Sequence, residues 1–328
     1  MKIRTTDPDG TTANITALCR SITWSGDYRN AARTLSFSPV VSDTDRNLPR
    51  APTALGGSAR FWHNGELLMD AFSLDRSRDS LGNTIDVTAY DRGLYLTRND
   101  KYIRVSGLTA EAVTASLCGE FGIEVGSLAS TGVPITRNFF GVSLYKIIMT
   151  MYTLAADQTG KKYRIRFRGA KLEVVEMAQT TESILLRPGS NLLPCITKES
   201  ASGMTNSVAI YDDGCNLIQT QQDDAAVRLY GLMQAAIKAS AYDDPVGHAR
   251  QLLSENGLQT TITLNALGNL KLITGNTVAV EEPITGTYGL FWIISDSHTW
   301  KRNVYQTKIA VSLEALMDAK TAGSLPTE

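Results

Sequence analysis

The spacing of apolar residues changes within one stretch, residues 143–177, and this change limits what the chain can fold into. Apolar residues first recur every three or four positions, the pattern of a helix with one buried face: Leu144, Ile147, Ile148, Met151 and Ala155. Ser143 can cap the start of this helix, and Gly160 can end it. The sequence therefore predicts a central helix over residues 144–159.

After this helix the period falls to two. Tyr163, Ile165 and Phe167 alternate with basic residues, as in a strand with one buried and one exposed face. Gly169-Ala170 is a two-residue link suited to a type II′ hairpin, and residues 171–177 supply the return strand. We therefore expect a helix packed on a short hairpin in the middle of the chain.

Short strands with frequent turns are predicted on both sides of this centre. Asn64-Gly65, between two apolar runs, is the strongest hairpin signal, and Asp212-Asp213-Gly214 marks another. Residues 1–98 therefore indicate a small barrel or sandwich. Helical sequence interrupts the second β region, beginning at Asp244-Pro245 and ending at Asn256-Gly257 in its clearest part. The two β regions show no sequence repeat.

Composition excludes several classes of protein. The 328 residues include 32 Lys or Arg and 33 Asp or Glu, a balance that argues against non-specific binding to nucleic acid or anionic membranes. No run of about 20 apolar residues could span a membrane, and the N-terminus lacks the apolar core of a signal peptide. Four widely spaced cysteines are expected to stay reduced, so we expect folding in a cytoplasm.

Residues that commonly carry catalysis are not grouped. The three histidines are not spaced as metal ligands, and the sequence predicts no catalytic, cofactor-binding or metal-binding residues and no cofactor. Ser143 lies in a partial match to G-x-S-x-G, for which helix capping is the better account. His298 is either a ligand or a hairpin residue near a turn. Four loop acids are interpreted as turn formers: Asp43, Asp45, Asp212 and Asp213.

One local cluster of charge has two interpretations. Four basic residues lie on or next to the strand that begins at Tyr163: Lys162, Arg164, Arg166 and Arg168. They could contact an acidic partner surface or nucleic acid. The alternative is cross-strand pairing with Glu173 and Glu176 on the return strand.

Several blocks of sequence together resemble the XkdQ/YqbQ type of phage tail hub protein. They are SLYKII at 143–148, AADQTGKKY at 155–163, GAKL at 169–172, YGLMQ at 230–234 and YGLFWIISDSHT at 288–299. The match extends over about residues 20 to 315. The resemblance implies a structural protein without catalysis at the centre of a contractile tail baseplate, in a complete phage or a bacteriocin-like particle. Related hubs are trimers in which two β-barrels per subunit form a torus.

With this resemblance the predicted fold is α+β, mainly β, with two small antiparallel β-barrel domains. The first barrel is expected over residues 1–98, a mixed α/β domain over 99–182, and the second barrel over 183–222 and 257–318. A helical insertion occupies 223–256, and a flexible tail 319–328. Alternating apolar residues should fill the barrel cores: Ile85, Val87, Ala89, Ile309, Val311 and Leu313.

The resemblance also implies partners and a place of action. These partners are further copies of the chain in a homotrimer, the tail tube protein, the central spike protein, other baseplate proteins and, as a further candidate, the tape measure protein. No specific nucleic acid and no membrane span are expected. The protein would be assembled in the bacterial host cytoplasm into a virion tail or tail-like particle, joining a six-fold tube to a three-fold spike.

Two alternatives remain, a cell-wall-degrading protein and a sugar-binding tail-tip module. The absence of a recognisable catalytic set argues against the first. Exposed tryptophans would favour the second, and we expect at least three of Trp24, Trp62, Trp292 and Trp300 to be buried.

Overall fold

The structure, a computed structural model, describes residues 1–42, 44–80, 82–179, 184–241 and 244–326. Its internal contacts divide the chain into two compact units, residues 1–195 with 263–328 and residues 196–262. Strands dominate over helices α1 to α5, which confirms the α+β, mainly β class. None of the described helices is long and apolar enough to cross a membrane.

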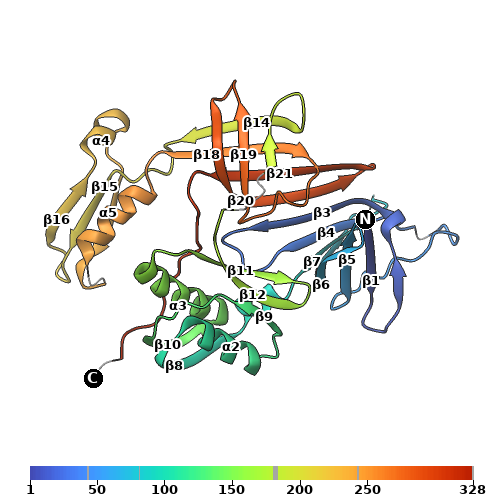
Figure 1. Cartoon of the computed structure of the whole chain (residues 1–328), viewed down its shortest axis with the longest axis horizontal. Helices are drawn as coiled ribbons and strands as arrows, with labels where there is room; N and C mark the ends of the chain where they lie inside the picture. The colour runs from blue at the N-terminus through green and yellow to red at the C-terminus, as the bar shows by residue number, and fades with distance from the viewer. Residues whose placement is uncertain (43, 81, 180–183, 242–243, 327–328) are drawn as a thin grey trace. The chain divides into compact units, whose positions relative to one another are not determined.

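The first β region forms seven strands (Figure 1). They are β1 (Lys2–Thr6), β2 (Thr12–Asn14), β3 (Cys19–Asp27), β4 (Thr34–Pro39), β5 (Ser58–His63), β6 (Glu66–Arg78) and β7 (Ile85–Tyr90), paired in the order β3-β4-β7-β6-β5-β1-β2. Asn64 and Gly65 have φ values of 48° and 86°, as a type I′ turn requires, so the predicted hairpin joins β5 to β6. Val87 and Ala89 are buried, and Ile85 packs against the same core.

The second β region contributes six strands. They are β13 (Ile184–Leu186), β14 (Leu192–Ser200), β18 (Gln259–Leu267), β19 (Thr277–Glu282), β20 (Thr287–Lys301) and β21 (Val304–Ser312). Ile309 and Val311 are buried as predicted. Leu313 is 71% exposed just beyond β21, so its predicted place in a core is wrong.

The two β regions share one strand order. If β2 is left aside and the six strands of each region are numbered along the chain, both follow the spatial order two-three-six-five-four-one. This order is β3-β4-β7-β6-β5-β1 in the first region and β14-β18-β21-β20-β19-β13 in the second. In both, the fifth strand is long and bulged, and it pairs with the fourth strand through its first half and the sixth through its second. One difference is that β1 runs antiparallel to β5, whereas β13 runs parallel to β19.

Strands β3 and β20 connect the regions into one 13-stranded sheet, with Ser21–Asp27 antiparallel to Ser295–Lys301. Strand β19 pairs with β20 only from Thr287 to Trp292, and β3 takes the edge that β19 leaves free. Pairing satisfies backbone groups that an exposed edge would leave open. The prediction of two small antiparallel β-barrel domains is therefore not confirmed: the described strands form an open path and no closed barrel.

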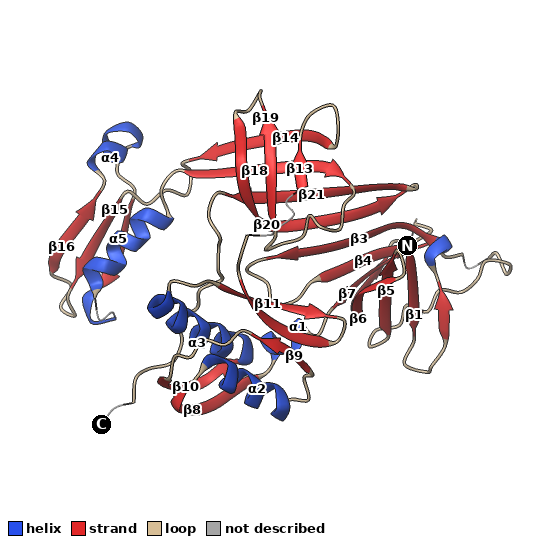
Figure 2. Cartoon of the chain, viewed as in Figure 1, coloured by secondary structure: helices blue, strands red, loops and turns tan. Residues whose placement is uncertain are grey.

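The central region combines helices and short sheets. Its elements are α1 (Gly93–Arg98), β8 (Asp100–Leu108), α2 (Ala110–Glu120), β9 (Val125–Leu128), β10 (Ile135–Ser143), α3 (Leu144–Thr159), β11 (Tyr163–Arg168) and β12 (Lys171–Glu176). Helices α2 and α3 lie beside β8 and β10 (Figure 2). Ser143 accepts a hydrogen bond from the Lys146 N–H at 3.3 Å, and Gly160 ends α3 with a φ of 70°.

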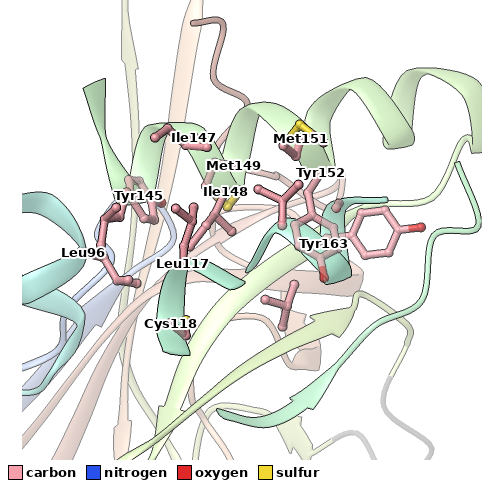
Figure 3. Packing of buried hydrophobic residues seen from close by; sticks show 14 of the residues in the cluster. Leu96, Leu117, Cys118, Tyr145, Ile147, Ile148, Met149, Met151, Tyr152 and Tyr163 are labelled. Carbon is pink, nitrogen blue, oxygen red and sulfur yellow. The ribbon is translucent and has the colours of Figure 1, made fainter. Parts of the chain in front are cut away.

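The predicted central helix and hairpin are confirmed. Every apolar position predicted for the inner face of α3 is buried, and Figure 3 shows this face packed against α2 and Tyr163. Gly169 has the positive φ, 60°, that the first central position of a type II′ turn requires. Tyr163 is fully buried, whereas Ile165 and Phe167 are half-buried at the edge of the same core.

The unit of residues 196–262 has its own sheet and helices. Its elements are β15 (Ser207–Tyr211), β16 (Leu217–Gln222), α4 (Asp224–Tyr230), β17 (Gln234–Lys238) and α5 (Pro245–Glu255). The sheet order is β16-β15-β17, and α5 packs on it through Val208, Ile210 and Ala249 (Figure 1). The sequence placed residues 207–222 in the second barrel and expected only helices over 223–256. Instead these strands belong with α4, β17 and α5.

The remaining predicted domain boundaries are not settled by the division into two units. Those after residues 98 and 318 do not coincide with this division and stay predictions. The boundary between residues 182 and 183 lies outside the described residues.

The C-terminal segment is attached through residue 324, although the sequence predicts a flexible tail over 319–328. Arg137 donates to the carbonyls of Ala322 and Gly323, and the backbones of Asn138 and Ser324 exchange two hydrogen bonds of 2.9 Å. Residues 327–328 of the predicted tail lie outside the described residues.

Candidate functional site

A buried ion pair lies where the two β regions meet. Arg33 follows β3 in the chain and reaches Asp296 on β20, with Nη1 3.0 Å from Oδ1 and a second, shorter contact from Nη2. The Thr274 N–H donates to the same carboxylate at 2.7 Å. Burial acts to raise the pKa of Asp296, but Arg33 and His298 more than offset it and hold that pKa well below its usual range.

Local sequence makes room for this pair. A Cβ on Gly26 would lie 2.3 Å from Nη1 of Arg33, so only glycine lets the guanidinium pass here. The guanidinium also lies 3.9 Å from the ring centroid of Trp24, a cation–π contact. Charge, hydrogen bonds and an aromatic face therefore fix Arg33 in one place.

His298 lies next to this pair and is fully buried in β20. Its Nδ1 is 2.8 Å from the Tyr305 hydroxyl, and its Nε2 is 3.3 Å from Oδ2 of Asp296. The Trp24 and Trp300 rings also contact the imidazole. No group of three His, Cys, Asp or Glu suited to a metal occurs among the described residues. His298 is therefore a residue of the β20–β21 hairpin, the second of its two interpretations, and it pairs with Thr307 within the hairpin.

A cavity of about 300 Å³ adjoins the ion pair. Trp24 and Arg33 line it from the first β region, Arg164 from the β11–β12 hairpin, and Asp318 from the C-terminal segment. Asp91 also lines it, and burial raises the pKa of this carboxyl to about 6. The cavity is thus lined by charged groups from three regions of the chain.

Two of the predicted basic residues bind carbonyl groups of this chain. Arg164 donates to the Thr274 carbonyl and fills the space over Gly275, where a Cβ would lie 2.4 Å from the guanidinium carbon. Burial lowers the pKa of Arg164 to about 10. The Lys162 ammonium donates to the Ala315 carbonyl at 2.7 Å.

The other two basic residues differ from each other. Arg166 forms the predicted cross-strand pair with Glu173 at 2.7 Å, whereas Glu176 pairs with Lys161 at 2.9 Å. Arg168 is exposed at the end of β11, opposite Lys171. Lys162 and Arg168 are both exposed, but among the described residues only Arg168 of the four has no hydrogen bond or ion pair. The role of this basic group in partner contact stays a prediction.

The remaining predicted residues have local roles. Asp45 accepts from the Asn47 N–H, and Asp212 from the Gly214 and Asn216 N–H groups, as turn formers do. Asp213 pairs with Lys238 at 2.6 Å. The fourth loop acid, Asp43, lies outside the described residues. Ser143 caps α3, in keeping with the capping interpretation.

Two tryptophans, Trp24 and Trp300, are buried, and Trp62 and Trp292 are half-buried. The expectation of at least three buried tryptophans is therefore wrong. Even so, none of the four is exposed, so they give no support to a sugar-binding surface.

Comparison with known proteins identifies the protein family to which this chain belongs. A sequence profile of the YQBQ-like family matches residues 22–312, and the chain belongs to this family. XkdQ, from the phage-like element PBSX of Bacillus subtilis (strain 168), is 21% identical over 306 residues, which cover 90% of this chain and 92% of XkdQ. The predicted resemblance to the XkdQ/YqbQ type of phage tail protein is confirmed.

Solved structures share the fold. The 43 kDa tail protein of prophage MuSo2 from Shewanella oneidensis aligns with a TM-score of 0.67 and 13% identity, covering 95% of this chain and 98% of that one. An Escherichia coli type VI secretion component, described as similar to the phage T4 tail proteins gp27 and gp5, aligns with a TM-score of 0.55 and 11% identity. That alignment covers 94% of this chain and 76% of the other.

Sequence reasoning missed the Arg33–Asp296 pair. The two residues are 263 positions apart, so no local spacing relates them. A signal exists in β20, where Asp296 falls on the same face as the buried His298 and Trp300. A carboxylate on the inner face of a strand predicts a buried cationic partner, although not which one.

Proposed function

We propose that this protein is a structural, non-catalytic hub of a contractile phage tail or tail-like particle. In this proposal three copies form a ring that joins a six-fold tail tube to a three-fold central spike. The repeated strand order of the two β regions carries the proposal, because it gives each chain two similar modules despite the absence of a sequence repeat.

Symmetry is the reason this repeat matters. A closed ring of identical subunits has a single rotational symmetry. Three chains with two similar modules each would offer six similar surfaces to a tube, while features that occur once per chain would offer three to a spike. The α2–α3 region and residues 196–262 are such single features.

The proposed partners follow from this role. They are two further copies of the chain, the tube protein, the spike protein and other baseplate proteins, with assembly in the bacterial host. The family and the fold of the similar tail proteins support this assignment. The proposal requires no catalytic group, cofactor or metal.

Reconstitution with the two neighbours tests the role. The purified protein would be mixed with the tube protein and the spike protein of the same particle, separately and together, and complexes would be separated by size. We expect a ternary complex with three copies of this chain. Failure to bind both partners, or measurable clearing of peptidoglycan by the purified protein, would overturn the proposal.

A further inference from the structure

Helix α4 is an unusually exposed apolar element. It spans Asp224–Tyr230, and none of its residues is buried. Leu229 is 72% exposed, Tyr230 40% and Leu232, just beyond the helix, 61%. Apolar side chains at such exposure, gathered on one element, mark an interaction surface more often than isolated ones do.

The helix is nevertheless fixed at both ends by one buried residue, Asn206. Its side-chain Nδ2 donates to the Gly231 carbonyl at 2.7 Å, and its Oδ1 accepts from the Met233 N–H at 2.8 Å. Its backbone carbonyl accepts from the Asp223 N–H at 2.9 Å. Side chains held in place before binding lose less entropy on binding, so α4 is preorganised as a contact element.

A groove of about 450 Å³ runs beside α4. Leu229 and Tyr230 of α4 line it, together with Leu253 of α5, Leu258 just beyond α5, and Met204. Leu258 is 47% exposed. Two helical segments with apolar side chains therefore flank a groove of the kind that takes an amphipathic helix.

The core of this unit is small in comparison. Within residues 196–262, the buried cluster under α5 contains only Val208, Ile210 and Ala249 among its fully buried members. Small domains bury a low fraction of their apolar surface, and many gain stability from a partner. The apolar groove residues are consistent with such a partner.

Charge indicates what the partner carries. Residues 196–262 contain eight Asp or Glu and four Lys or Arg, in a chain that is otherwise close to balance. Asp223 lines the groove, Asp224 follows it on α4, and Glu255 follows the lining residue Ser254 at the end of α5; all three acids are exposed. Basic residues beside an apolar stripe would complement this rim.

We propose that the groove between α4 and α5 binds an amphipathic helix, apolar on one face and basic on its flanks, from another protein. The proposal goes beyond the hub role and does not depend on it. An edge strand is a poorer match, because none of the residues that line the groove belongs to a strand with which it could pair.

Binding of a defined peptide to the full-length protein tests this. The probe is a labelled peptide of about 18 residues, or five helical turns, with leucines at helical spacing and lysines elsewhere. Matched peptides carry glutamate in place of lysine, or the same residues in scrambled order. Fluorescence anisotropy measures the binding of each peptide to the wild-type protein and to the variants Leu229→Asp and Leu313→Asp. Leu313 is the control, because it is similarly exposed but lies in the other unit.

We expect the lysine peptide to bind about tenfold or more tightly than either matched peptide. Leu229→Asp should weaken it by about tenfold or more, as loss of an anchor residue does, and Leu313→Asp should leave it unchanged. Equal binding of all three peptides, or equal loss in both variants, would overturn the proposal. A third result would also overturn it: Leu229→Asp changes the mass of the protein in solution but leaves peptide binding unaltered. The occupant of the groove would then be a second copy of this chain.

Discussion

Two buried carboxylates lie near the place where the two β regions meet, and their surroundings differ. Asp296 is paired with Arg33, lies next to His298, and keeps its charge. Asp91 accepts from the backbone N–H groups of Gly93 and Arg33 at 2.8 and 3.2 Å, which does not offset its burial. One carboxylate therefore favours folding at neutral pH, and the other opposes it.

Replacing Asp296 with alanine should destabilise the protein strongly. The change leaves the Arg33 side chain, 16% exposed, without its carboxylate, and breaking a buried pair typically costs about 3–5 kcal/mol. Urea unfolding at pH 7 measures the loss. Glu176→Ala serves as the control, because its pair with Lys161 is exposed and should contribute less than about 1 kcal/mol. Equal losses of unfolding free energy in the two variants would contradict the importance of the Arg33–Asp296 pair.

Asp91 should make the unfolding free energy fall as pH rises from about 4 to about 6. Its pKa rises from 3.8 to about 6 on folding, so the folded state holds the proton more tightly than the unfolded state. The destabilisation is absent below the lower value and complete above the higher one, at about 3 kcal/mol. Asp91→Asn removes this group. The unfolding free energy of the variant, measured across this pH range, should increase relative to that of wild type as pH rises. Parallel profiles for the two proteins would contradict the assignment.

At the level of elements, the period of apolar residues in the sequence correctly predicted the helix and the hairpin that form from residues close together in the chain. Helix α3, its caps and the β11–β12 hairpin follow from residues a few positions apart. Strand β17 was missed because Gln234–Lys238 is short and forms only by parallel pairing with β15, which precedes it by more than 20 residues. The Arg33–Asp296 pair was missed for the same reason over a longer distance.

The position of the β11–β12 hairpin depends on the fit of Arg164 over Gly275. Gly275→Ala adds a Cβ in a backbone conformation with φ of 84°, which costs about 1–3 kcal/mol, and it also displaces the guanidinium. In an Arg164→Ala background only the backbone cost remains. Chemical denaturation of the four proteins in this cycle should therefore give a smaller loss for Gly275→Ala when Arg164 is absent, by about 1–3 kcal/mol. Additive losses would mean that the two residues do not constrain each other.

At the level of the whole molecule, residues 196–262 should be removable. Pro194 and Asn265 lie close together, since the Asn265 side chain donates to the Pro194 carbonyl at 3.3 Å, so a short Gly/Ser link can replace the intervening unit. The remaining unit should keep its β-type circular dichroism and a cooperative thermal transition. Deleting only residues 224–256 is the informative comparison, because it removes α5 from Val208 and Ile210 and should cause partial unfolding. An unfolded product from the longer deletion would show that the two units fold together.

Three copies in a ring make a specific prediction about symmetry. The repeated strand order should give a ring of β modules with near six-fold symmetry, whereas residues 196–262 occur once per chain and should appear three times. Light scattering should give a mass three times the 35.6 kDa of the chain for the protein alone, or, after mixing with the tube and spike proteins, the mass of a complex that contains three copies of it. In averaged end-on electron micrographs, six-fold averaging should preserve the ring of β modules and blur the density of residues 196–262. The variant that lacks residues 196–262 should move the images toward six-fold symmetry. A different copy number in both samples, or β modules unequally placed around the axis, would rule out the pseudo-six-fold hub, even though each chain carries the repeated topology.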